Sequence, residues 1–143
     1  MSELQIRIGR RFCGPPRSGN GGYVAGRLAR FVDAPAVGVR LRASPALETS
    51  LAVRKTSEGA MLVDGENVIA EARAVELDLS PPSPPSFEKA EKAAHSFRGF
   101  HEHVFPGCFV CGPDRGEGDG LRIFPGAEGE KGLFAAPWIP DVS

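Results

Sequence analysis

Tyr23–Val32 reads YVAGRLARFV, and its apolar residues recur at intervals of three and four positions. This spacing is typical of a helix with a wide apolar face, which includes Val24 and Leu28. Arg27 and Arg30 fall on the other side of that helix. The sequence therefore predicts a single apolar helix that another layer of structure must cover.

Segments of alternating apolar and polar residues before and after this helix predict strands. We expect them over Gln5–Cys13, Val37–Ala43, Ser50–Thr56, Ala60–Val63 and Asn67–Leu77. Asp64-Gly65-Glu66 lies between the last two, and a glycine there supplies the positive backbone torsion that a tight hairpin requires. The order of strand, helix and antiparallel meander predicts an α+β fold in which a curved antiparallel sheet wraps around a central helix.

A proline-rich segment, LSPPSPPSF at Leu79–Phe87, predicts a semi-rigid connector because proline removes backbone donors and favours extended conformations. We therefore predict three regions: a first unit over residues 1–80, a linker with a short helix over 81–100, and a partial second unit over 101–143. The short helix is expected at Glu88–Ala94, and strands at Leu121–Phe124 and Gly132–Ala136. The partial second unit is too short for a core of its own, so we expect it to pack on the first unit or on another chain.

The composition excludes several classes of partner. The 143 residues carry a formal charge of −1, with basic and acidic residues mixed along the chain, which argues against nucleic-acid binding. No apolar run approaches the roughly 20 residues needed to cross a bilayer, and the N-terminus lacks the apolar core of a signal peptide. We therefore expect no membrane partner and a cytoplasmic location. Three cysteines do not form a secreted disulfide framework, and we expect reduced thiols.

Two segments carry a family resemblance. Phe12–Arg30, FCGPPRSGNGGYVAGRLAR, has a glycine pair opening an apolar helix, and it resembles the helix entry of thioesterase-like proteins with two hotdogs in one chain. Cys108–Phe124, CFVCGPDRGEGDGLRIF, followed by FAAPWIPD at Phe134–Asp141, resembles the strands that open many single-hotdog thioesterases. The chain thus resembles the hotdog-fold acyl-CoA thioesterase-like superfamily, with one hotdog unit and the opening strands of a second, and we expect it to stop at Ser143 where the second helix would begin.

This resemblance implies binding or hydrolysis of an acyl-CoA thioester, with coenzyme A as part of the substrate and no other cofactor. It also implies a homo-oligomer or a second hotdog partner, because the active sites of the family lie between two helices. In many relatives a histidine precedes the glycine pair and an acidic residue follows about two helical turns later. Here Asn20 holds the first place and Ala29 or Arg30 the second. The resemblance therefore leaves turnover dependent on a second hotdog unit, and a non-catalytic acyl-CoA-binding or dimerisation module is the alternative.

The glycine-rich helix entry has a chemical rationale. Backbone N–H groups at a helix start can approach an acyl carbonyl, and the helix dipole favours the negative charge that develops there. We assign this oxyanion-type role to Asn20, Gly21 and Gly22, and substrate contacts to Arg17, Ser18, Gly19 and Tyr23. The alternative is that the glycines only make a tight turn, with Asn20 or Ser18 capping the helix. We identify no general base, because Asp33, Glu48, Asp64 and Glu66 fall on predicted turns or helix ends.

A rival site is an HxH pair followed by a CxxC pair: His101, His103, Cys108 and Cys111. These residue types bind zinc, but the spacing matches no standard zinc ribbon or finger, and the cysteines are also explained as small buried hydrophobes. A zinc-stabilised interaction domain is therefore the less favoured hypothesis. Five arginines are candidate contacts to coenzyme A phosphates: Arg17, Arg27, Arg30, Arg40 and Arg42. We expect Cys13 to be packed rather than nucleophilic, and Phe134 and Trp138 to bury apolar area against a partner unit.

Overall fold

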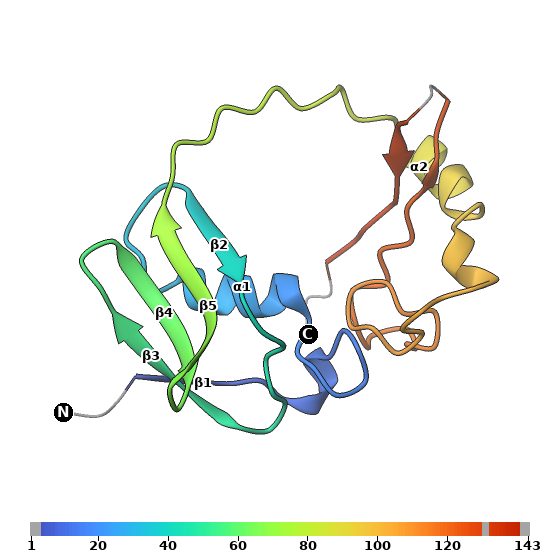
Figure 1. Cartoon of the computed structure of the whole chain (residues 1–143). Helices are drawn as coiled ribbons and strands as arrows, with labels where there is room; N and C mark the ends of the chain where they lie inside the picture. Colours follow the sequence, from blue (N-terminus) through green and yellow to red (C-terminus); the bar gives the residue numbers. More distant parts are fainter. Residues whose placement is uncertain (1–3, 130–131, 141–143) are drawn as a thin grey trace. The chain divides into compact units, whose positions relative to one another are not determined.

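The computed structural model describes residues 4–129 and 132–140 and has an α+β fold with two compact units (Figure 1). Unit 1 is Met1–Leu79 and unit 2 is Ser80–Ser143. Among the described residues, no helix has both the length and the apolar character needed to cross a membrane.

The described part of unit 1 contains a five-stranded antiparallel sheet and one α-helix. The elements are β1 (Gln5–Arg7), the 3-10 turn η1 (Arg10–Phe12), α1 (Gly21–Ala29), β2 (Val37–Leu41), β3 (Ser50–Lys55), β4 (Gly59–Asp64) and β5 (Asn67–Ala74). The strand order across the sheet is β1-β3-β4-β5-β2, so β1 and β2, which flank α1 in sequence, form the two edges. The prediction of a strand, a helix and then an antiparallel meander is confirmed at this level.

The core of unit 1 lies between α1 and one face of the sheet. Alternate residues of the paired strands point to this face: Leu62 of β4 pairs with Ala70 of β5, and both are fully buried. Val24 and Leu28, the apolar positions predicted for the helix, are also fully buried and belong to the same cluster. The remaining buried members of the cluster are Ile6, Ile8, Leu51, Val53, Ala60, Ile69 and Ala72.

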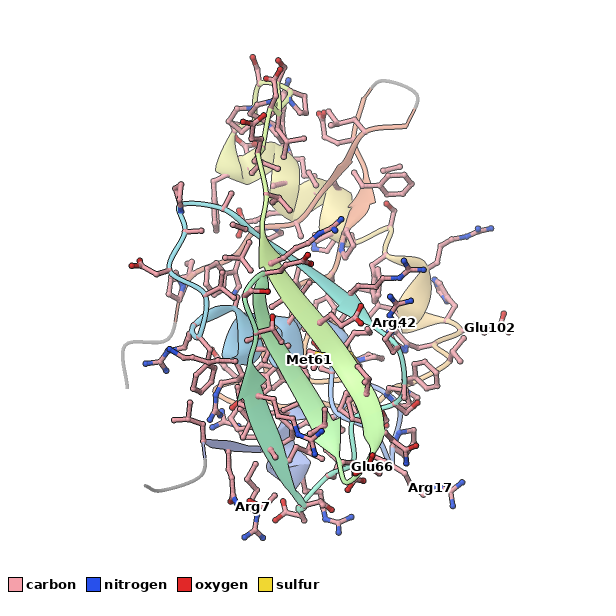
Figure 2. All side chains as sticks on the ribbon, turned by 60° about the vertical axis from the view of Figure 1, so that its left-hand side comes forward. Arg7, Arg17, Arg42, Met61, Glu66 and Glu102 are labelled. Atoms are coloured by element: carbon pink, nitrogen blue, oxygen red, sulfur yellow. The ribbon has the colours of Figure 1, made fainter. Side chains whose placement is uncertain are left out.

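The opposite face of the sheet carries polar side chains. Glu71 of β5 pairs with Arg40 of β2 on one side and with Met61 of β4 on the other. Figure 2 shows the labelled Met61 over the middle of the sheet with Arg42 nearby, and Arg42 donates to the Glu71 carboxylate at 2.7 Å. These side chains therefore lie on the face of the sheet that α1 does not cover.

The predicted hairpin is present. Asp64 pairs with Asn67 across the two strands, and Gly65 adopts φ +58° between them. A side chain at Gly65 would meet nothing within 4 Å, so glycine is required here by the backbone conformation and not by space.

The prediction for the strand over Gln5–Cys13 was wrong in its extent. Only Gln5–Arg7 pairs in the sheet, and a 3-10 turn follows before Cys13 forms an isolated bridge with Gly19. The predicted strand ends early because the Phe12 amide turns back to the Gly9 carbonyl at 2.9 Å.

The predicted helix also differs at both ends. It begins at Gly21, two residues earlier than expected, and ends at Ala29 instead of Val32. Beyond Ala29 the amides of Phe31 and Val32 bond to carbonyls three residues back, at 3.0 Å each, which closes the last turn. Both side chains still pack against the core, which explains their apolar character without a longer helix.

Unit 2 has little regular structure. It contains α2 (Phe87–Ala94), the 3-10 turn η2 (Arg98–Phe100), and the short strands β6 (Gly126–Ala127) and β7 (Phe134–Ala135). Ser86 caps α2 by accepting from the Lys89 amide at 3.3 Å, as its sequence position favours. The helix predicted at Glu88–Ala94 is therefore confirmed.

The strand predicted at Leu121–Phe124 is absent from the described residues of unit 2. Arg122 adopts φ +53°, which interrupts an extended backbone. The amides of Leu121 and Ile123 instead bond to the carbonyls of Phe109 and Val110, at 2.8 and 2.9 Å. The strand expected over Gly132–Ala136 is present in part, as the two residues of β7.

Candidate functional site

The loop that leads into α1 is held by backbone bonds. The Asn20 amide donates to the Phe12 carbonyl at 2.8 Å, and the Gly14 amide donates to the Ser18 carbonyl at 3.0 Å. The Gly19 amide donates to the Pro45 carbonyl at 2.9 Å, which ties the loop to the segment after β2. The entry to α1 is therefore fixed at several points and not merely linked to the sheet.

Asn20 is the N-cap of α1. Its Oδ1 accepts from the Tyr23 amide at 3.1 Å, and its own backbone is extended, as capping residues require. Ser18, the other residue considered as a cap, is buried and lies in a bridge with Ala46. Two roles were considered for Asn20, and the capping role is the one that the structure shows.

Gly21 and Gly22 form the first turn of the helix. The amides of a first helical turn have no acceptor four residues back. Within residues 4–129 and 132–140, neither of these two amides has a hydrogen-bond partner. Gly22 is exposed, whereas Gly21 faces the Leu41 side chain so closely that an added Cβ would lie 2.8 Å from Leu41 Cδ1. Gly21 is needed for packing, and Gly22 leaves open backbone at the helix entry.

The residues assigned to substrate contacts have different environments. Gly19 is buried, and a Cβ there would lie 3.0 Å from Val24 and 3.1 Å from Ile8, so it faces the core. Tyr23 is half-buried and stacks on Phe12 with ring centroids 4.0 Å apart. Arg17 is exposed, and Figure 2 shows it extending outward. Of these residues, Tyr23 lies next to the open turn in the helix itself.

Two contacts at the helix entry were not predicted from the sequence. Phe12 stacks on Tyr23, and Leu41 faces Gly21. Arg27 donates to the Tyr23 hydroxyl at 2.9 Å, and its guanidinium lies 5.7 Å from the centre of the Tyr23 ring. The four-residue spacing of Tyr23 and Arg27 was a usable signal for this contact. The contacts of Phe12 and Leu41 join segments distant in sequence and had no such signal.

The acidic residues considered as bases do not gather at this entry. Asp33 lies beyond the other end of α1, which at nine residues is about 13 Å long. Glu48 accepts from Arg7 at 2.8 Å and from the Arg10 amide. These contacts, from Arg7 first, hold the pKa of Glu48 below its ordinary value. Asp64 and Glu66 are exposed at the hairpin, so no base is assigned among these acidic residues.

One cavity lies in unit 1 and another in unit 2, and neither of these two is lined by Asn20, Gly21 or Gly22. The cavity of unit 1, about 490 Å³, lies on the outer face of the sheet and includes Arg40, Arg42 and Glu71. The cavity of unit 2, about 550 Å³, lies between the proline-rich segment and β7. The helix entry of unit 1 is therefore separate from both of these cavities.

The candidate arginines for coenzyme A phosphates are dispersed. Arg17 and Arg30 are exposed, and Arg27 is bound to Tyr23. Arg40 and Arg42 line the cavity on the outer face of the sheet, opposite α1. These five side chains do not form a single phosphate site in unit 1, and an assignment of any one of them stays a prediction.

The HxH and CxxC residues come together only in part. His103 Nε2 lies 3.4 Å from Cys111 Sγ, and Cys111 Sγ lies 3.8 Å from Cys108 Sγ, whereas His101 is exposed. No group of three or more His, Cys, Asp or Glu side chains in the described part of the chain is arranged to hold a metal ion.

Cys13 is buried in unit 1, in agreement with a packing role. Phe134 and Trp138 are 62% and 49% exposed, and their burial against a partner unit stays a prediction.

Comparison of the chain with protein-family models, curated proteins and solved structures finds no match.

Proposed function

We propose that unit 1 is a hotdog unit of the acyl-CoA thioesterase type that binds the thioester group of an acyl-CoA at the entry to α1. The observation that carries this proposal is the Asn20-capped helix start, where the Gly21 and Gly22 amides have no partner among the described residues. Such amides, at the positive end of the helix dipole, stabilise negative charge on a carbonyl oxygen.

The arrangement of the elements supports the hotdog assignment. A single helix comes between the first two strands of a five-stranded antiparallel sheet and packs against β2, β4 and β5. In a hotdog unit a curved sheet wraps around one central helix, and the segment Phe12–Arg30 carries the resemblance to that family. The same helix therefore links the fold and the site.

Hydrolysis requires a group that activates water, and unit 1 has no assigned base at the helix entry. In the family that the sequence resembles, the active site lies between the helices of two hotdog units. We therefore propose that a second hotdog unit, from another copy of this chain or from a different protein, supplies the acidic residue and completes the acyl pocket. The substrate is a cytoplasmic acyl-CoA, and coenzyme A is part of the substrate.

A second candidate function is acyl-CoA binding or dimerisation without catalysis. The departure of this sequence from the family pattern supports it, because Asn20 replaces the histidine before the glycine pair and Ala29 or Arg30 replaces the later acid. Both functions use the same carbonyl-binding turn, and they differ in whether coenzyme A is released.

The test of binding uses Gly22→Val. A valine side chain at this exposed position would cover the open amides, and the nearest atom to the added Cβ would be Asn20 Oδ1 at 3.4 Å, an ordinary contact. We expect the affinity for acetyl-CoA or palmitoyl-CoA, measured by isothermal titration calorimetry, to fall at least about tenfold, which corresponds to about 1.4 kcal/mol.

The matched control is Gly26→Val, because Gly26 is an exposed glycine of the same helix with nothing within 4 Å of an added Cβ. This variant introduces the same side chain into the same helix and should keep its affinity. Equal affinity of the Gly22 and Gly26 variants for acyl-CoA would remove the helix entry from the site. Release of coenzyme A, followed by chromatography, separates the enzyme from the non-catalytic binding protein.

A further inference from the structure

Unit 2 contains a cluster of two thiols and an imidazole that the proposed function does not use. The sulfur atoms of Cys108 and Cys111 are 3.8 Å apart, and Cys111 donates to Cys108. His103 Nε2 lies 3.4 Å from the Cys111 sulfur. The three side chains come from one loop, so the conformation of that loop sets the distances between them.

Backbone bonds hold the loop in shape. The Cys108 amide donates to the Phe105 carbonyl at 2.8 Å, and the Gly112 amide donates to the Cys108 carbonyl at 2.9 Å. A Cβ at Gly112 would lie 2.4 Å from the Pro106 carbonyl oxygen and 2.5 Å from the Cys108 nitrogen, so only glycine fits there. The two thiols are therefore held in proximity by a closed turn.

The hydrogen bonds of His103 argue for a thiol pair and against a metal centre. The Phe105 amide donates to His103 Nδ1 at 2.9 Å, so Nδ1 is an acceptor. In a neutral imidazole the proton then lies on Nε2, which faces Cys111 as a donor. A metal at Nε2 would need the lone pair of that nitrogen. This agrees with the lack of a metal-holding group among the described residues.

The described part of unit 2 has a small apolar core. Among its described residues, the buried apolar side chains are those of Ala90, Ala93, Cys108 and Ala135, and none belongs to a large aliphatic or aromatic residue. Units of this size with so small a core usually depend on a disulfide, a metal or a partner.

We propose that Cys108 and Cys111 are a thiol-modification site, at which a low-molecular-weight disulfide such as oxidised glutathione converts the pair to an intramolecular disulfide. Cys111 reacts first because it is partly exposed, whereas Cys108 is buried at 6%. Cys108 is the resolving residue because its sulfur is the one in contact with Cys111.

The reaction balances in two exchanges. Cys111 first loses its proton to solvent, and its thiolate then attacks one sulfur of oxidised glutathione, which forms a mixed disulfide and releases one glutathione thiolate. Cys108 then loses its proton to solvent, and its thiolate attacks the Cys111 sulfur, which forms the protein disulfide and releases the second glutathione. The protein dithiol loses two electrons, and oxidised glutathione gains them.

The environment of Cys111 determines how fast this occurs. Burial, followed by the neighbouring Cys108, raises the pKa of Cys111 to about 11. The thiolate is therefore scarce at neutral pH, and the exchange is slow there and accelerates as the pH rises. The same environment does not stabilise the reduced pair as a thiolate, so the disulfide, once formed, resists reduction more than one made from acidic thiols.

The test uses the full chain, reduced and then incubated with oxidised glutathione at mildly alkaline pH. Remaining thiols are labelled with N-ethylmaleimide under denaturing conditions, and the protein is analysed by mass spectrometry and peptide mapping. Of the three cysteines, one label should remain, on Cys13, and one peptide should carry a Cys108–Cys111 link. Mapping of the unmodified chain requires no variant to fold.

Cys13→Ser is the matched control, and it should still form the link and retain no label. Cys111→Ser should retain labels on both remaining cysteines. Three labels on the treated wild-type chain would overturn the proposal, as would a stable glutathione adduct on Cys111 or a link to Cys13. Stoichiometric zinc in the reduced protein that protects both thiols from labelling would also overturn it. None of these outcomes depends on acyl-CoA binding.

Discussion

At the scale of single residues, Glu48 connects two segments of unit 1. Its carboxylate accepts from Arg7 at 2.8 Å and from the Arg10 amide, and its own amide donates to the Ile8 carbonyl at 2.8 Å. Glu48 adopts φ +58°, a conformation that is uncommon for a residue with a side chain. These bonds hold the segment before β3 against β1 and the 3-10 turn.

Glu48→Gln should destabilise unit 1 at neutral pH, because the amide cannot form the ion pair with Arg7. The pKa of Glu48 is lowered in the folded chain, so its contribution is present above the ordinary value of 4.5 and is lost as the pH falls through the lower folded value. The melting temperatures of the wild type and the variant, followed by circular dichroism, should therefore differ at neutral pH and converge in acid. Glu66→Gln, at the exposed hairpin turn labelled in Figure 2, is the control, and at neutral pH its melting temperature should match that of the wild type. A constant difference for Glu48→Gln at all pH values would contradict this account.

At the scale of elements, α1 shows which features of a helix can be predicted from the sequence and which cannot. Its buried positions, Val24 and Leu28, follow from periodicity, and the turn at Gly65 follows from residue type, because both signals are local. The end at Ala29 could not be predicted, because Phe31 and Val32 continue the apolar pattern while packing from a turn. Arg122 is a harder case, since nothing in its residue type indicates the positive φ that prevents a strand. The candidate site has the same limit: the glycine pair is visible in sequence, but the Leu41 contact with Gly21 is not.

Gly26→Ala should stabilise α1. Gly26 is exposed near the middle of the helix, has an ordinary helical conformation, and leaves nothing within 4 Å of an added Cβ. The substitution reduces the backbone freedom of the unfolded chain, which is worth about 0.5–1 kcal/mol. Urea unfolding followed by circular dichroism measures the gain. A loss of stability would contradict this account, because the added methyl group would then have a contact that the open space around Gly26 does not provide.

At the scale of the whole molecule, the two units differ in what they bury. Unit 1 has a contiguous core with fully buried Ile6, Leu28, Leu51 and Leu62, whereas the described part of unit 2 buries alanine and cysteine side chains. Burial of large aliphatic side chains is the main source of folding free energy, at about 1.5–3 kcal/mol each. Most of the stability should therefore lie in unit 1, and unit 2 should depend on its loop bonds and on the state of its thiols.

Hydrogen–deuterium exchange on the intact, reduced chain should resolve this difference. Amides of β3, β4 and β5 can exchange only when the core of unit 1 opens, whereas those of 105–114 require only a local opening of the thiol loop. We expect the strand amides to exchange at least about a hundredfold more slowly than the loop amides, a difference of about 2.7 kcal/mol in opening free energy. Formation of the Cys108–Cys111 disulfide should slow exchange in the loop, because the link restricts its opening, and leave the strands of unit 1 unchanged. Equal protection of both units in the reduced chain would show that unit 2 gains its stability from contacts beyond its own small core, and the disulfide would then have little left to stabilise.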